Sequence, residues 1–236
     1  EVAVVEDALV ERVHDLEVAA VEEGPFDVVF VLEGSARPEF LRMLERYSAI
    51  RWSRLPSDLR YRFLWPVGAT ERQRTMVANT YPITNRMSGA DGFFLSQLTS
   101  MKWHGYAVDG QRLVDAVAVA ALAAAEEERR RAVVLVLGPE AKDGSLLSRG
   151  EVASFLDDLD VPILVWSVGL ESVESARWEG TTLVRSRRTL DTALQQLVAR
   201  LERQRIVWIE GAHRPSSVVL APRAGAARPA GSATRP

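Results

Sequence analysis

Short, almost uninterrupted apolar runs alternate along this chain with stretches whose apolar residues recur at helical spacing. The clearest run, FDVVFVL over residues 26–32, follows Gly24-Pro25 and has the pattern of a strand buried on both faces. The next run is YRFLWPV over residues 61–67, and Pro66 should confine this strand to a sheet edge or end it early. Strands are therefore predicted over residues 26–32, 61–67, 132–137, 161–168, 181–184, 205–209 and 217–220.

Helical spacing of apolar residues fills most of the intervals between these runs. Asp109 can cap a helix that leads into the apolar stretch 113–125. Three glutamates (126–128) precede three arginines (129–131) at offsets of three and four, which indicates an exposed, self-pairing helix end. Turn signals over residues 68–108 predict a long loop with one short helix. Further helices are expected over residues 38–51, 149–159, 171–178 and 188–203.

Strands that alternate with helices in this order predict an α/β fold, a three-layer open, mostly parallel sheet with helices on both faces. Ligands of such sheets bind beyond the carboxyl ends of the strands, so the loops after Leu32, Leu137 and Val168 are the places to look for function. Residues 1–23 are expected to form an N-terminal strand or linker segment and residues 24–222 the domain, while 223–236 read as a disordered Ala/Pro/Gly/Arg tail.

Composition narrows the function classes. A net charge of −3 indicates no polyanion-binding protein, and the absence of cysteine excludes disulfides, thiolate metal sites and cysteine nucleophiles. The longest apolar run, residues 114–125, is too short to cross a membrane. The first residue is Glu1, and the residues after it do not form the basic stretch followed by an apolar one that is typical of a signal peptide. We therefore expect a processed chain or an excised piece.

Three segments expected at the carboxyl ends of the strands contain short motifs whose order and spacing can be compared with a known family. Glu33-Gly34-Ser35-Ala36-Arg37 follows the first strand, DGQRLVDAV (109–117) opens a helix, and GPEAKDGS (138–145) follows the strand over 132–137. Order and spacing over residues 24–222 resemble von Willebrand factor A (VWA) domains of a bacterial branch, whose loops carry the Asp-x-Ser-x-Ser, Thr and Asp ligands of a metal-ion-dependent adhesion site. The resemblance implies a VWA/Rossmann-like fold.

The resemblance also implies that this adhesion site is degenerate. Glu33 replaces the Asp, Arg37 replaces the last Ser, Gln111 or Gly110 stands near the Thr, and Gly138-Pro139-Glu140 stands at the ligating Asp. A guanidinium there would repel a cation. We therefore expect a non-enzymatic protein-interaction or scaffold module without a cofactor, whose partner is another protein or another domain of its parent. Its binding rim should comprise Glu33, Ser35, Arg37, Gln111, Glu140 and Asp143.

Alternatives remain open at this point. Glu33, Ser35 and Asp143 could rebuild a site for Mg²⁺ or Ca²⁺, which would make the chain a cation-dependent adhesion domain. Arg37 could instead pair with Glu33 or Asp143. A hydrolase that uses Ser35 or Asp143 is a second alternative, although the sequence identifies no base beside Ser35. The sequence leaves the compartment open, and only the analogy with the bacterial branch suggests an exported, periplasmic or extracellular protein.

Histidines and arginines add little to these alternatives. His14, His104 and His213 are separated in sequence and fit no metal-ligand spacing. Arginines interleave with aromatic residues over residues 51–86, a mixture that could stack on and neutralise single-stranded nucleic acid. Aromatic residues of a strand usually face the core while its arginines point outward, so we favour a structural role for this segment and expect no nucleic-acid partner.

Overall fold

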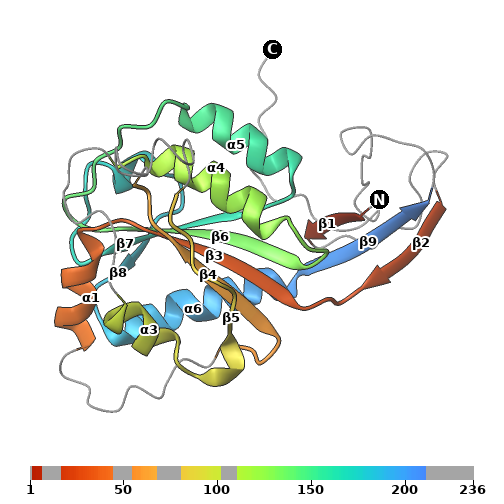
Figure 1. Cartoon of the computed structure of the whole chain (residues 1–236), viewed down its shortest axis with the longest axis horizontal. Coiled ribbons are helices and arrows are strands. Elements are labelled where there is room, and N and C mark those ends of the chain that lie inside the picture. The colour runs from red at the N-terminus through yellow and green to blue at the C-terminus, as the bar shows by residue number, and fades with distance from the viewer. Residues whose placement is uncertain (1, 7–16, 45–54, 68–80, 102–110, 211–236) are drawn as a thin grey trace.

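The computed structural model describes residues 2–6, 17–44, 55–67, 81–101 and 111–210. Its centre is an open six-stranded sheet with the strand order β5-β4-β3-β6-β7-β8 (Figure 1). All neighbouring pairs run parallel except β4 and β5 at one edge. The strands are β3 (Phe26–Leu32), β4 (Leu59–Leu64), β5 (Met87–Ser88), β6 (Arg130–Leu137), β7 (Ile163–Val168) and β8 (Thr182–Val184).

Helices cover both faces of this sheet, as the sequence predicts. α4 (Leu113–Ala124) and α5 (Arg149–Asp158) pack on the face that presents Val29 and Val31 of β3. α1 (Ala36–Leu44), α3 (Phe94–Ser100) and α6 (Arg187–Glu202) pack on the face that presents Val28 and Phe30. Since successive side chains of a strand point to opposite faces, a doubly covered sheet needs apolar residues at every position, and β3 is buried throughout.

The two faces are filled differently. Phe30 lies with its ring centroid 4.9 Å from that of Phe94 and 5.8 Å from that of Trp166, so aromatic rings fill the face under α1, α3 and α6. Tyr61 and Phe63 belong to the same cluster. On the opposite face α4 is rich in alanine, and its small side chains let the helix backbone lie close to the sheet. α4 is apolar almost all round because nearly all of its residues are buried.

A second, three-stranded sheet lies at the amino-terminal end of β3 and β6 (Figure 1). β9 (Gln204–Glu210) is its central strand and pairs antiparallel with β1 (Val2–Glu6) and β2 (Glu17–Glu22). At the junction, a Cβ on Gly24 would lie 2.2 Å from the tip of the Ile206 side chain, which would have to move to admit it. The amide of Gln204 exchanges two hydrogen bonds with the backbone of Arg131, at 2.7 and 2.8 Å, and thereby joins β9 to β6.

The structure confirms the α/β fold class and corrects several boundaries. α4 ends at Ala124, and Arg130 and Arg131 begin β6, so the predicted exposed helix end over 126–131 is wrong. β4 ends at Leu64, before Pro66, and is not an edge strand. Residues 171–178 contain only the 3₁₀ turn Ser175–Arg177. The expected strand 217–220, the tail 223–236, Asp109, Gly110 and all three histidines lie outside the described residues. No described helix is long and apolar enough to span a membrane.

An ionic network closes the amino-terminal end of the large sheet. Asp27 of β3 is fully buried, 3.1 Å from Nε of Arg86 and 3.7 Å from a guanidinium nitrogen of Arg62. Burial raises the pKa of the Asp27 carboxyl, and the two guanidiniums oppose that shift. Arg62 also donates to the Ala123 carbonyl at the end of α4, and both arginines reach Glu126. These arginines therefore have the structural role that we favoured.

Asp27→Ala should lower the free energy of unfolding by about 3–5 kcal/mol, because it removes the buried countercharge of Arg62 and leaves only the half-exposed Glu126 to pair with it. Urea unfolding followed by circular dichroism measures this change. Glu126→Gln is the matched control, since Glu126 is 55% exposed and should cost less than about 1 kcal/mol. Equal effects of the two substitutions would show that burial of Asp27 does not govern the network.

Candidate functional site

The candidate site lies where the strand order of the large sheet reverses. β3 and β6 are neighbours at the centre of the sheet, and their connections leave in opposite directions toward β4 and β7. Open α/β sheets bind their ligands in the crevice at such a switch point. The loop after β3 carries Glu33 and Ser35, and the loop after β6 begins with Gly138. The backbone N–H of Glu33 donates to the Val136 carbonyl at 3.0 Å and fixes the two loops side by side.

Glu33 is completely buried, and its carboxylate accepts four hydrogen bonds. Oε1 accepts from the Ser35 N–H at 2.9 Å and from Nε2 of Gln111 at 2.8 Å. Oε2 accepts from the Ser35 hydroxyl at 2.6 Å and from the Gly138 N–H at 2.9 Å. A buried carboxylate is costly unless hydrogen bonds replace its water, and here four protein donors take that place.

Gln111 connects three loops through its amide and its backbone. The side chain, only 1% exposed, donates to Glu33 and accepts from the Gly34 N–H at 3.2 Å. Its backbone carbonyl accepts from the Gly144 N–H at 2.8 Å. Gln111 therefore holds the Glu33 carboxylate in place.

Gly138 is required by the close approach of the loop after β3. A Cβ at this position would lie 2.3 Å from the Ser35 hydroxyl and 2.3 Å from the Ala36 nitrogen. The absent side chain allows the Gly138 N–H to reach Glu33.

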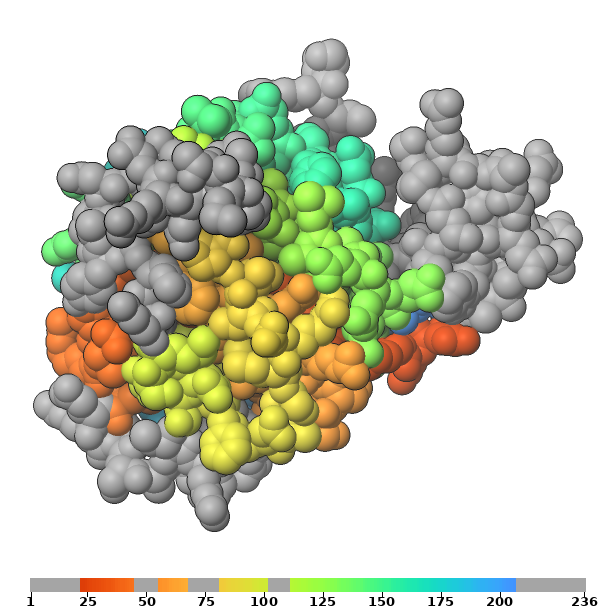
Figure 2. Space-filling view, viewed as in Figure 1, coloured from red at the N-terminus to blue at the C-terminus, as the bar shows by residue number. Residues whose placement is uncertain are grey.

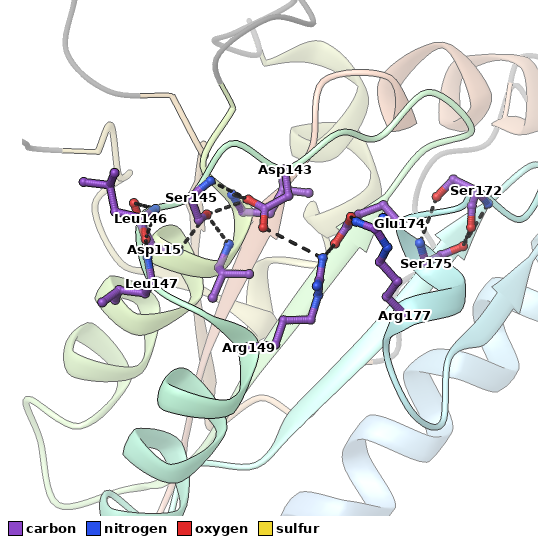
Figure 3. A network of polar contacts seen from close by, with 12 residues as sticks. Asp115, Asp143, Ser145, Leu146, Leu147, Arg149, Ser172, Glu174, Ser175 and Arg177 are labelled. Carbon is purple, nitrogen blue, oxygen red and sulfur yellow. Dashed lines mark hydrogen bonds and ion pairs between the residues drawn. The ribbon is translucent and has the colours of Figure 1, made fainter.

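Asp143 and Ser145, further along the loop after β6, cap the amino terminus of α4 (Figure 3). Asp143 Oδ1 accepts from the Leu113 N–H at 2.9 Å, and the Ser145 hydroxyl oxygen accepts from the Val114 N–H at 2.9 Å. In return, Asp115 of α4 accepts from the Leu146 N–H at 3.1 Å and from the Leu147 N–H at 2.9 Å. Side-chain oxygens at a helix amino terminus satisfy N–H groups that have no partner within the helix.

Arg149, at the start of α5, joins this loop to the loop after β7 (Figure 3). Its guanidinium pairs with Glu174, lies 3.9 Å from Asp143, and sits 5.7 Å above the ring of Trp178. Arg177 pairs with the same carboxylate of Glu174 at 3.2 Å. The loop after β7 is folded on itself as well, because Ser172 and Ser175 exchange hydrogen bonds through their hydroxyls and N–H groups.

The structure brings only part of the sequence-predicted site together. Glu33, Ser35 and Gln111 form one hydrogen-bonded group, and the Glu140 N–H donates to the Ser35 hydroxyl oxygen at 3.2 Å. Asp143 belongs to the separate cap of α4. Arg37 forms no ion pair with Glu33 or Asp143, so the pairing considered from the sequence is wrong. Sequence reasoning missed the roles of Gly138, Asp115, Ser145, Arg149 and Glu174.

The carboxylate oxygens of the site are hydrogen-bonded within the protein. Among the described residues, no three His, Asp or Glu side chains converge on a point that could hold one. Glu33 already accepts four hydrogen bonds, and Asp143 Oδ1 accepts three, from Leu113 N–H and from the N–H and hydroxyl of Ser145. A cation would have to displace several of these donors to gain the oxygen ligands that it prefers.

Ser35 has a carboxylate within reach but not the setting of a nucleophile. Its hydroxyl donates to Glu33 at 2.6 Å, which supplies the neighbour that the hydrolase alternative requires. That carboxylate is buried and holds three other hydrogen bonds, so it has no free position from which to accept and pass on a proton. The turn into α1 explains the contact between Ser35 and Glu33.

No protein-family model and no curated protein matches the sequence. Solved structures do resemble it. Proximal thread matrix protein 1 from the mussel byssus, with a zinc-occupied MIDAS motif, is 14% identical over 82% of this chain and 50% of that chain, with a TM-score of 0.48. Manganese-loaded TRAP protein of Plasmodium vivax is 11% identical over 85% of this chain and 84% of that chain, with a TM-score of 0.42. This chain spans half the length of the mussel protein.

Gly138→Ala should lower the free energy of unfolding by about 1–3 kcal/mol or more, because the added methyl group meets the backbone of the loop after β3. Thermal and urea unfolding measure the change. Gly150→Ala is the matched control, since Gly150 lies in α5 with no atom within 4 Å of its added Cβ, and should gain about 0.5–1 kcal/mol. A tolerated Gly138→Ala would contradict the tight contact between the loops.

Proposed function

We propose that this chain is a VWA-type domain that binds another protein, or another domain of its own parent, at the carboxyl edge of the large sheet and without a metal ion. The observation that carries the proposal is the Glu33 carboxylate, which is fully buried and hydrogen-bonded to four protein donors. Such a group stabilises the loops around it but offers no lone pair to a cation. What remains for function is the outer surface of these loops.

The arrangement of the loops is a second argument for this proposal. The loops that carry the sequence resemblance, after β3, before α4 and after β6, meet at the switch point of the sheet. Each loop is held by hydrogen bonds to another loop or to the start of a helix, so their outer surface is rigid. A rigid surface loses little conformational entropy when it binds a partner. The rim predicted from the sequence comprises Glu33, Ser35, Arg37, Gln111, Glu140 and Asp143. Because Glu33 and Gln111 are buried, the surface proposed for the partner is formed by the other four residues.

The alternative is a cation-dependent binding domain in which Glu33, Ser35 and Asp143 exchange their present partners for Mg²⁺ or Ca²⁺. The similar structures hold zinc and manganese, so divalent cations are the first ligands to test. Glu33 and Asp143 lie in separate hydrogen-bonded groups, and a shared metal would require both groups to rearrange.

Calorimetric titration with Mg²⁺, Mn²⁺ and Ca²⁺ should give no binding heat in the micromolar range, because the buried carboxylate keeps its protein donors. Glu33→Gln keeps the size of the side chain and serves as the control for any residual heat. Micromolar binding by the natural chain that Glu33→Gln or Glu33→Ala abolishes would favour the cation-dependent domain and refute this part of the proposal.

Affinity capture from cells of the source organism should recover the same partner in EDTA and in Mg²⁺, since no cation takes part. Arg37→Glu reverses a charge on the proposed rim and should weaken recovery by about tenfold, a loss of roughly 1.4 kcal/mol. Arg60→Glu is the control. Arg60 lies at the amino-terminal end of β4, away from the carboxyl ends of the strands, so this substitution should leave recovery unchanged. Recovery that requires Mg²⁺, or that is equal for both variants, would contradict the proposed rim.

A further inference from the structure

The described strands leave four outer sheet edges, and one of these edges differs from the others. In the part of the chain that the structure describes, β5 and β8 end the large sheet, and β1 and β2 end the small one. β5 has two residues and β8 has three, so each offers few backbone groups to a further strand. β1 and β2 have five and six residues, and among the described strands each pairs only with β9. An open edge of this length invites another strand unless something blocks it.

β2 has two features that protect an edge. Its register with β9 shifts between Val18 and Ala20, and such an irregularity bends a strand and hinders further pairing. The strand also begins with Glu17 and ends with Glu22. If β2 paired antiparallel with a second β2 about its centre, these glutamates would lie opposite each other at both ends of the ladder, and like charges directly opposite are destabilising. β2 is therefore a poor site for a further strand.

β1 has neither of these protections. Its pairing with β9 runs from Val2 to Glu6 without a shift in register. The strand reads Val-Ala-Val-Val-Glu, with β-branched residues at three positions, no proline, and one charged residue at its end. Natural sheets block exposed edges with charges, prolines or bulges, so an edge without them is expected to be covered by another strand.

From this comparison we infer that the chain forms a dimer through β1, in which the β1 strands of two copies pair antiparallel about a two-fold axis at Val4. Val2 then lies opposite Glu6 of the second copy, and Val4 lies opposite its own counterpart. The two Glu6 residues are at opposite ends of the ladder, about 13 Å apart at roughly 3.3 Å per residue, so they do not face each other. The two small sheets join into one antiparallel sheet with the order β2-β9-β1-β1-β9-β2.

A second copy fits this edge because β1 is compatible with itself. Two-fold pairing of β1 with β1 closes after two copies and leaves only the protected β2 strands at the ends of the joined sheet. Pairing of β1 with β2 of the next copy would meet the irregularity in β2, and it would leave one open edge at each end. Such head-to-tail contacts do not close and would grow into filaments.

The dimer leaves the proposed rim accessible. Figure 1 shows the small sheet beyond the amino-terminal ends of β3 and β6, and in Figure 2 the segment that leads into it, residues 22–26 in red, lies at the margin of the body. The rim lies at the carboxyl ends of the same two strands. A dimer therefore presents two rims, and a partner with two matching sites would bind it more tightly than a single chain. The dimer does not depend on the proposed function, since no rim residue takes part in it.

Sedimentation equilibrium of the full chain tests the dimer. We expect a dissociation constant on the order of 10–100 µM, because a five-residue ladder is smaller than a standard interface. Val4→Lys and Val4→Glu each place like charges opposite each other at the axis, and each should weaken the dimer about fivefold or more. An equimolar mixture of the two variants should restore it, because lysine then lies opposite glutamate. This recovery also shows that neither variant has lost β1.

Ala20→Lys is the matched control. It lies in β2, on the other side of β9, and should leave the dissociation constant unchanged. A monomer at every concentration would refute the dimer and leave a strand of another protein as the occupant of the edge. Filaments, or equal effects of Val4→Lys and Ala20→Lys, would refute two-fold pairing through β1. A mixture that stays monomeric would refute the axis at Val4. None of these results alters the expectations for the rim.

Discussion

The neutralisation of one buried carboxylate organises the functional edge of this protein. Glu33 follows the central strand, and its charge is compensated by donors from its own loop, from Gln111 before α4 and from Gly138 after β6. Because an unpaired carboxylate at this depth would be costly, all three segments must be in place at once. The carboxylate that resembles a metal ligand in the sequence thus acts as the centre of an internal hydrogen-bonded cluster.

The same principle extends outward along the edge of the sheet. Asp143 and Asp115 are also surrounded by backbone N–H groups, and Glu174 is enclosed by two guanidiniums. In each case an acidic group is shielded from solvent while its partners, or apolar side chains, face outward. The side chains that remain exposed on these loops carry both signs of charge, among them Glu140, Lys142, Glu171 and Arg177.

The architecture could be predicted because each kind of element leaves its own pattern in the sequence. Doubly buried strands such as β3 leave a continuous apolar run, and helices such as α6 leave apolar residues at helical spacing. Prediction failed where distant contacts override local pattern. Arg130 looked like one end of a helical charge run, yet it lies in β6, 4.0 Å over the ring of Phe26, with a hydrogen bond to the Gly24 carbonyl. Glu33, Ser35 and Gln111 of the hydrogen-bonded cluster were named from the sequence. Their partners were not, because Gln111 and Glu33 are 78 positions apart and nothing local shows that an amide will meet that carboxylate.

The small sheet gives the domain a distinct response to mechanical load. In the pairing of β1 with β9, Val2 lies opposite Trp208 and Glu6 lies opposite Gln204. The start of β1 and the far end of β9 are therefore neighbours, and tension applied at these two strand ends would pull along the hydrogen bonds and open them one pair at a time. This peeling would absorb extension at low force, so β3, β6 and the loops that they carry would keep their shape while the outer strands separated.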